Sequence, residues 1–115
     1  MHMMDWNNYR DQVLAGVGGI GKISPETTRG YAALSAAGDK TGYLDKKTRE
    51  LIAVACAVSL RCDGCITVHT KAARDAGATE NELTEALGVA VALNAGAGLV
   101  YSTRARDAFS AVAEA

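Results

Sequence analysis

Two cysteines and a histidine form the group of residues best suited to chemistry in this sequence. Cys62 and Cys65 are separated by two residues, and His69 follows four residues after the second cysteine. If a helix starts here, the three side chains fall at positions i, i+3 and i+7, which share one face. Both thiols then lie in the first turn, where free backbone N–H groups, the helix dipole and the nearby Arg61 stabilise a thiolate. We therefore expect both thiols to be more acidic than a free cysteine.

This group supplies what dithiol redox chemistry requires: a thiolate that attacks, a second thiol one turn away that resolves, and an imidazole that carries protons. In a reducing compartment such a pair is catalytic or metal-binding rather than a permanent disulfide. Zinc is the main competing interpretation, because two thiolates and an imidazole are three good ligands with an open fourth position. Structural zinc sites usually have a second ligand pair, which the sequence does not place nearby. Accidental packing of two small thiols is the remaining alternative.

The other cysteine and the other histidine lie outside this group. Cys56 is flanked by alanines and valines in an apolar run, so we expect its thiol to behave as a small hydrophobic side chain in the core. His2 lies near the N-terminus, and we assign it no role.

Glu50 is the fourth candidate, on a helix predicted over residues 45–60. Its carboxylate begins an apolar stripe and can point inward, whereas the spacing also allows a surface ion pair with Lys46, four residues earlier. If the chain returns antiparallel in the helix that starts at Cys62, Glu50 lies about 15 Å and His69 about 10 Å from the connecting turn. Because that offset is about one helical turn, we expect Glu50 to act together with His69.

Composition predicts an all-α fold around these residues. The 115 residues include 22 Ala and 12 Gly, and only 5% are aromatic. Alanine has the highest helix propensity, and small side chains let helices approach closely. The length suits a single domain that buries a core without disulfide or metal support. We expect one domain over residues 1–115, folded as a compact bundle of about six helices, at about 5–16, 24–38, 45–60, 62–76, 79–94 and 97–113.

Several local features refine this expectation. The glycine-rich stretch 16–21 is predicted as a loop, and Gly38 as a left-handed helix cap. Tyr31 and Leu34 are expected to face inward. The run 51–58 is apolar on all sides, which indicates a buried helix. A capping box of the Thr79-Glu80-Asn81-Glu82 type starts the helix after residue 78.

Charge and hydropathy exclude several classes of partner. A net charge of −1 gives no field that attracts nucleic acid or anionic lipid. The longest apolar stretch, 86–101, contains Asn94 and glycines and is shorter than the roughly 20 residues that cross a membrane. The N-terminus does not resemble a secretory signal, so we expect a cytoplasmic protein. The smooth apolar surface of 86–101 exceeds what one small bundle covers, which indicates a homo-oligomer.

The chain resembles the carboxymuconolactone decarboxylase superfamily, in its alkyl hydroperoxidase D branch. The matching pattern is Glu50, eleven intervening residues, Cys62-Asp63-Gly64-Cys65 and His69, and the similarity extends from about residue 44 to residue 109. The better-known hydroperoxidases are longer, so the chain resembles their compact core. Some of them also have a histidine between the two cysteines.

The resemblance implies an all-helical fold, trimers or hexamers, and a peroxidase or disulfide reductase site without a metal or organic cofactor. Cys65 would be the peroxidatic thiol and Cys62 the resolving thiol, with His69 and Glu50 as a proton relay. The substrate would be a hydroperoxide, and a dithiol, a thioredoxin-like protein or a lipoyl group would restore the thiols.

Two other functions stay open. One is a lyase that acts on a small carboxylated lactone, with His69 and Glu50 as acid and base. Decarboxylases of the superfamily typically lack the cysteine pair, which favours redox chemistry here. The other is a non-enzymatic protein that senses redox state or binds zinc through Cys62 and Cys65.

Overall fold

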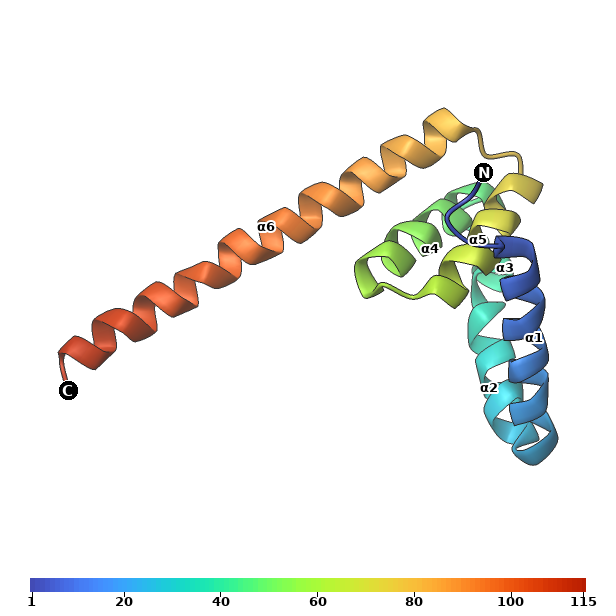
Figure 1. Cartoon of the computed structure of the whole chain (residues 1–115), viewed down its shortest axis with the longest axis horizontal. Helices are drawn as coiled ribbons and strands as arrows, with labels where there is room; N and C mark the ends of the chain where they lie inside the picture. Colours follow the sequence, from blue (N-terminus) through green and yellow to red (C-terminus); the bar gives the residue numbers. More distant parts are fainter.

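The computed structural model describes all 115 residues and is all-α, with no strand, as predicted. Helices α1 and α2 lie side by side as one hairpin, α4 and α5 form a second hairpin, and α6 runs beside α4 before it projects from the molecule (Figure 1). The six helices are α1 (Trp6–Ile23), α2 (Pro25–Ser35), α3 (Ala37–Thr41), α4 (Lys46–Leu60), α5 (Asp63–Asp75) and α6 (Glu80–Ala113).

The α4–α5 hairpin forms as the sequence predicts. Asp45 caps α4, because its carboxylate accepts a hydrogen bond of 2.8 Å from the N–H of Thr48. Arg61 ends α4 in the left-handed conformation, with φ at 54°, which is uncommon for a residue other than glycine. Cys62 then caps α5. The two helices are therefore joined by only two residues, and this short connection fixes their register.

The core of the chain lies between α4 and its neighbours, and α1 covers another side of α5. Only five residues are fully buried: Val54, Ala57, Thr67, Ala73 and Ala90. The Thr67 hydroxyl donates a 2.9 Å hydrogen bond to the carbonyl of Trp6 on α1. Val13 of α1 lies so close to Gly64 that a Cβ on this glycine would be 3.4 Å from the valine side chain. Helix α5 is therefore held between α1 and α4.

The glycine-rich stretch 16–21, predicted as a loop, is helical instead. Helix α1 continues without a break to Ile23. Each interior glycine costs about 1 kcal/mol relative to alanine, and packing along α2 offsets this cost. Gly21 shows why a small residue suits the contact, because a Cβ there would lie 3.0 Å from the Thr28 hydroxyl oxygen of α2. The loop prediction was wrong because helix–helix packing outweighs local propensity.

The left-handed glycine is Gly42, not Gly38 as predicted. The second helix ends earlier than expected, and Gly42 caps the short α3 with φ at 69°. Gly38 instead makes room for a side chain, since a Cβ there would lie 2.5 Å from the Cδ of Arg49. The Arg49 guanidinium donates to the carbonyls of Gly38 and Leu44 and pairs with Asp39. This contact fastens α3 to the start of α4.

The last two predicted helices are one continuous helix of 34 residues, α6. Asn94, where a break was predicted, bonds within the helix, because its side-chain amide donates to the Ala90 carbonyl one turn earlier. The same amide also donates to the Ser59 hydroxyl on α4, at 2.8 Å. Beyond this contact α6 projects away from the other helices (Figure 1).

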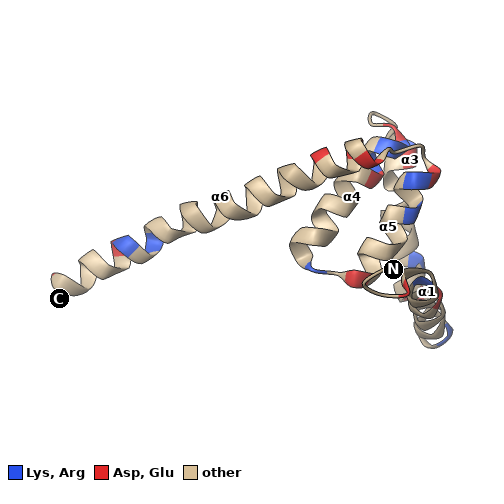
Figure 2. Ribbon diagram, turned by 45° about the horizontal axis from the view of Figure 1, so that its top comes forward, with Lys and Arg blue, Asp and Glu red and all other residues tan.

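By length and composition alone, α6 could cross a membrane. An 18-residue window has a mean hydropathy of 1.5, and no charged residue lies between Glu85 and Arg104 (Figure 2). The sequence argument against a membrane span relied on the short length of 86–101 and on its glycines and Asn94, whereas the helix is continuous and its uncharged part extends to Thr103. Only 6% of the window is buried within the chain.

Side chains predicted to lie in the core are exposed in the single chain. Tyr31 and Leu34 of α2 are exposed, and so is Cys56 of α4. Helix α4 buries only the side that faces α5 and α6, while Ile52 and Leu60 are uncovered. The predictions of a helix buried on all sides and of a core position for Cys56 are therefore wrong for the single chain.

An ion pair joins the first turn of α6 to the first turn of α4. Glu82 completes the predicted capping box with Thr79, and its other carboxylate oxygen lies 2.8 Å from the Lys47 ammonium. The hydrogen bond and charge of Glu82 raise the pKa of Lys47. The hydrogen bonds from Lys47 and from the Thr79 backbone lower the pKa of Glu82. Each group is thus held in its charged form by the fold.

We predict that Lys47→Met lowers the free energy of unfolding near neutral pH and has no effect at either extreme of pH. Because folding lowers the pKa of Glu82, its contribution is present above the pKa of the unfolded chain and is lost as the pH falls through the folded value. Because folding raises the pKa of Lys47, its contribution is lost as the pH rises through the folded value. Urea denaturation across pH measures the difference, with Lys46→Met as the control. Equal losses for both variants at neutral pH would contradict the prediction.

Candidate functional site

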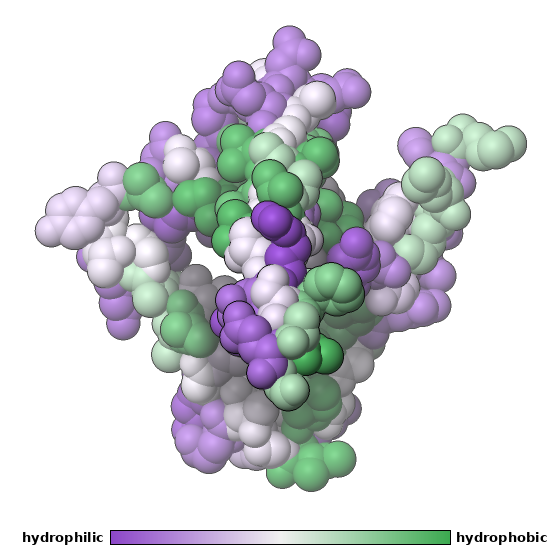
Figure 3. Space-filling view, turned by 90° about the vertical axis from the view of Figure 1, so that its left-hand side faces the viewer, coloured by the Kyte–Doolittle hydropathy of each residue, from purple (hydrophilic) through white to green (hydrophobic).

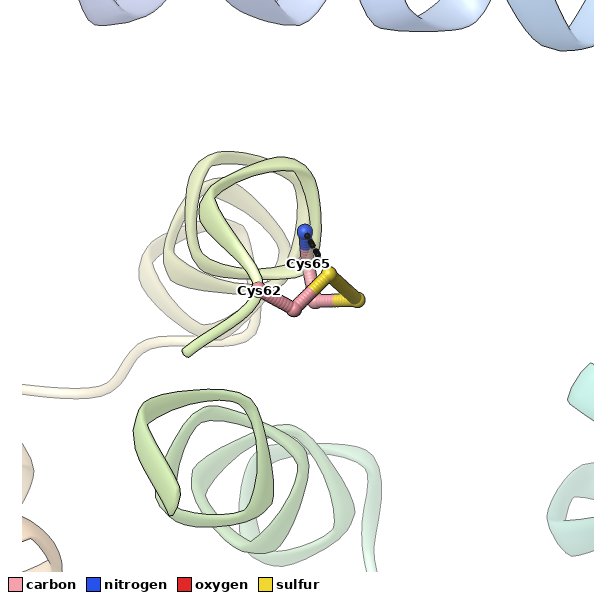
Figure 4. Close-up of a disulfide and its surroundings, with 2 residues drawn as sticks. All are labelled: Cys62 and Cys65. Atoms are coloured by element: carbon pink, nitrogen blue, oxygen red, sulfur yellow. Dashed lines mark hydrogen bonds between the residues drawn. A yellow bond between two sulfur atoms is a disulfide. The ribbon is translucent and has the colours of Figure 1, made fainter. Parts of the chain in front are cut away.

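The two cysteines of the predicted pair are joined at the start of α5. Cys62 and Cys65 form a disulfide with their Cα atoms 5.2 Å apart, and both residues are half-buried (Figure 4). Cys62 is also the N-cap of α5, because its Sγ accepts a 3.2 Å hydrogen bond from the backbone N–H of Cys65. A sulfur in this position receives the N–H groups and the positive end of the dipole that stabilise a thiolate.

The histidine and the glutamate of the predicted site meet across the α4–α5 hairpin. The His69 Nδ1 atom lies 2.7 Å from the Glu50 Oε2 atom. The side chains are 24% and 14% exposed, so both are largely withdrawn from water. Because Nδ1 is engaged by the carboxylate, Nε2 is the nitrogen left free to accept or donate a proton. The surface pair between Glu50 and Lys46, which the spacing also allowed, does not form.

All four predicted site residues therefore belong to one hairpin and one region. Glu50 comes from α4, Cys62 is the N-cap of α5, and Cys65 and His69 lie in the first two turns of α5. His69 is one turn after Cys65 and two turns after Cys62, so the imidazole is nearer along the helix to the second cysteine. The arrangement can move two electrons at the sulfur pair and one proton at the imidazole.

The remaining candidates stand apart from this region. Cys56 is a free, exposed thiol on α4, and His2 is exposed near the N-terminus. The structure gathers no group of three or more His, Cys, Asp or Glu side chains that could hold a metal ion. A cavity of about 610 Å³ lies on another face of α5, between Arg10 of α1, Lys71 and the start of α6, and none of the four site residues lines it.

Sequence reasoning missed two features of the site. It placed Cys62 inside the first turn, whereas the residue is the cap itself and its sulfur takes the hydrogen bond that a serine or aspartate cap takes elsewhere. It also missed Arg49, whose contacts with Gly38 and Asp39 hold the chain next to Glu50. The first feature had a sequence signal, since a polar atom before a helix start suggests a cap. The second had none, because the contact depends on how α3 folds back.

The sequence of this chain matches a known protein family over most of its length. The sequence profile of the carboxymuconolactone decarboxylase family matches residues 25–114. The chain belongs to the carboxymuconolactone decarboxylase family. This confirms the superfamily that the pattern of Glu50, the two cysteines and His69 indicated.

Relatives and solved structures support the family and its fold. An uncharacterised protein of Haemophilus influenzae is 47% identical over 106 residues, which cover 92% of this chain and 94% of the relative. An uncharacterised protein encoded in the cox locus of Paracoccus denitrificans is 37% identical, covering 79% of this chain and 82% of the relative. The crystal structure of a family member from Legionella pneumophila, in its apo form, has a TM-score of 0.73 and 38% identity, covering 91% of this chain and 94% of that one. A protein from Methanobacterium thermoautotrophicum has a TM-score of 0.66 and 35% identity, covering 72% of this chain and 93% of that one.

Proposed function

We propose that this family member is a thiol-dependent hydroperoxidase, similar to the alkyl hydroperoxidase D branch, that exchanges electrons with a dithiol reductant. The observation that carries the proposal is the cysteine pair at the first turn of α5, one turn before a histidine that is hydrogen-bonded to a carboxylate. Two thiols that can join within one turn form a two-electron couple that needs no other cofactor. A hydroperoxide is a two-electron oxidant, so one hydroperoxide molecule can oxidise the two thiols to one disulfide.

The reaction proceeds in three steps. The Cys65 thiolate attacks one peroxide oxygen, the O–O bond breaks, an alcohol leaves, and Cys65 becomes a sulfenic acid. The Cys62 thiolate attacks the sulfur of Cys65 and displaces water, which produces the disulfide. A dithiol, such as a thioredoxin-like protein, a lipoyl group or a small dithiol, then reduces the disulfide.

His69 and Glu50 form the proton relay of this mechanism. The free Nε2 of His69 accepts the thiol proton and returns it to the departing alkoxide. The Glu50 carboxylate lies 2.7 Å from the opposite ring nitrogen, Nδ1, and so leaves Nε2 as the nitrogen that exchanges the proton. The same pair would serve a lyase that acts on a carboxylated lactone. That alternative uses no thiol, so its activity would survive replacement of both cysteines.

The exposed surface supports a second proposal, that the protein is a homo-oligomer. The chain has an accessible surface of 8979 Å², whereas a folded monomer of this mass exposes about 5,900 Å². The excess of about 3,000 Å² is the size of an obligate interface. Apolar side chains gather on the face from which α6 projects (Figure 3), and the exposed ones on α6 include Val89, Leu93, Leu99, Val100 and Phe109.

We infer that further copies of this chain cover α6, in a trimer or a hexamer. The hydrogen bond from Asn94 of α6 to Ser59 of α4 already anchors the first half of α6 to the rest of the chain. The last turns carry Arg104, Arg106 and Asp107, which suit a wet interface rim better than lipid. We therefore propose a protein of the cytoplasm, where dithiol reductants keep thiols reduced.

We predict that one equivalent of hydroperoxide removes two of the three free thiols of the reduced protein. The reason is that Cys62 and Cys65 are placed to join, while Cys56 is outside the site. Thiol titration before and after oxidation measures the change, and in Cys56→Ser the count should fall from two to none. Peptide mapping that finds Cys56 in the disulfide would contradict the prediction.

Single cysteine variants test the roles of the two thiols. Cys65→Ser should abolish peroxide consumption, because it removes the attacking sulfur. Cys62→Ser should still react once and retain a sulfenic acid on Cys65, which dimedone labelling and mass spectrometry detect. The opposite pattern would reverse the two roles.

We predict that Glu50→Gln lowers peroxide turnover about 100-fold, at the lower end of the effect of a positioned acid or base, because His69 remains. The loss should be greatest below the pH at which the attacking thiol ionises unaided and should shrink in alkali. Stopped-flow assays across pH measure the effect, and Glu85→Gln, an exposed glutamate on α6, is the matched control. Wild-type turnover at every pH would exclude Glu50 from the relay.

We predict a solution mass that is a multiple of 11.9 kDa, with three or six copies. Val100→Asp places a carboxylate on the uncovered part of α6 and should shift the protein to assemblies with fewer copies or to single chains. Arg106→Asp, which adds the same side chain to a position already charged, should leave the assembly intact. Light scattering measures both variants. A wild-type mass of one chain at micromolar concentration would overturn the proposal.

A further inference from the structure

The cavity beside α1 has the composition of a small-molecule site. Its volume is about 610 Å³, within the range of about 300–1,000 Å³ that is usual for ligand cavities. Helices α1 and α5, the connection after α5 and the first turn of α6 all contribute to its wall. Trp6 lines it at the start of α1, and we call it the Trp6 cavity.

The Trp6 cavity is separate from the cysteine pair. Thr67, Lys71 and Arg74 line it from α5, at spacings of i, i+4 and i+7 that share one helical face. Arg74 follows Cys65 by about two and a half helical turns, which puts the two residues on opposite sides of α5. A molecule held in the cavity is therefore not in contact with the sulfurs.

Two guanidinium groups in the wall have no carboxylate partner within the chain. Arg10 donates to the side-chain oxygen of Asn7 at 2.6 Å and to the carbonyl of Thr67 at 3.4 Å, and both acceptors are neutral. Arg74 is exposed and takes part in none of the ion pairs of the chain. A guanidinium matches a carboxylate in geometry and donates strong hydrogen bonds to it. Arg10 and Arg74 are therefore suited to an anionic ligand.

The acidic groups of the wall indicate how much charge the ligand carries. Asp75 is paired with the Lys71 ammonium at 2.6 Å, so these two groups cancel. Glu80 is the other carboxylate in the wall, and against Arg10 and Arg74 it leaves an excess of one positive charge. A carboxylate matches this excess, whereas a phosphate monoester carries nearly two negative charges at neutral pH. The balance therefore favours a ligand with one carboxylate.

The apolar part of the wall indicates that the ligand also has an apolar body. Trp6 and Leu83 are half-buried, and Ala73 between them in sequence is fully buried. The Thr67 hydroxyl donates to the Trp6 carbonyl at 2.9 Å, which holds this end of α1 against α5. An indole offers a flat surface on which another ring can stack. Small-molecule sites combine apolar surface of this kind with a few polar groups that orient the ligand.

We propose that the Trp6 cavity binds a small aromatic monocarboxylate, whose ring lies against Trp6 and Leu83 and whose carboxylate pairs with Arg10 and Arg74. The cavity is a second site of the protein, and it takes no part in the thiol chemistry. The proposal does not depend on the hydroperoxidase function.

The fluorescence of Trp6 tests this proposal directly, because Trp6 is the one tryptophan of the chain. The probe is phenylacetate, added to the full-length protein at neutral pH and constant ionic strength, with excitation where the probe does not absorb. We expect a saturable change with half-saturation at about 1 mM, a reasonable affinity for a ligand of about ten non-hydrogen atoms. A signal that does not saturate would overturn the proposal.

Three further probes separate the parts of the ligand. Phenylacetamide has the same ring without the charge, and acetate has the charge without the ring. Each should need a concentration about tenfold higher or more, because a charge-assisted hydrogen bond or the stacked ring is lost. Equal binding of the amide would exclude carboxylate recognition, and equal binding of acetate would indicate an adventitious ion only. Tighter binding of phenyl phosphate would overturn the choice of a monoanion.

Variants locate the binding to the cavity. Arg74→Gln should raise the half-saturation concentration about tenfold, because it removes one charge-assisted donor. Arg10→Gln should act in the same direction, with circular dichroism to confirm the fold, since Arg10 also bonds to Thr67. Arg29→Gln removes the same charge from an exposed position on α2 and is the matched control. An equal loss in the control would mean that net charge, not the cavity, attracts the probe.

Replacement of both Cys62 and Cys65 by serine separates the cavity from the redox site. Half-saturation by phenylacetate should be unchanged, because the cysteines do not line the cavity. Loss of binding in this double variant would place the carboxylate at the cysteine pair and overturn the proposal.

Discussion

The two-residue connection between α4 and α5 is the constraint on which the site depends. Arg61 turns the chain in the left-handed conformation and Cys62 caps the next helix, so there is no slack with which the two helices could slide past each other. The register that results brings the His69 imidazole within 2.7 Å of the Glu50 carboxylate. It also puts a sulfur at the start of α5, where helix N–H groups are unpaired. This short connection therefore aligns His69 with Glu50 and places the Cys62 sulfur at the N-terminus of α5 at the same time.

The site contains few charged groups. The Cys62 sulfur accepts a hydrogen bond from a backbone N–H, and the pair of His69 and Glu50 is shielded from water on most of its surface. Such groups lose less to salt screening than exposed ion pairs do. The exposed pairs of the chain, between Lys47 and Glu82 and between Lys71 and Asp75, lie outside the site. The first pair joins α4 to α6, and the second joins adjacent turns of α5.

The sequence predicted the site better than the overall shape. Helix caps and chemical side chains are local signals, so the bounds of α4 and α5 and the meeting of Glu50 with His69 could be derived from spacing. The catalytic roles of these residues remain predictions. The errors fall where tertiary contact decides: Gly21 is helical because α2 packs against it, and Asn94 is helical because its amide bonds to Ser59 and Ala90. Glycine and asparagine are ambiguous by themselves, because they suit both a break and a close contact.

The long uncovered helix α6 has a consequence for how the protein responds to dilution. A chain with so few buried residues gains little free energy by folding alone. On the proposed assembly, folding and association are one equilibrium, and mass action sets the fraction of folded chains. The melting temperature then rises with protein concentration. Because α4 carries Glu50 and also anchors α6, the proposed assembly would make the alignment of Glu50 with His69 depend on protein concentration as well.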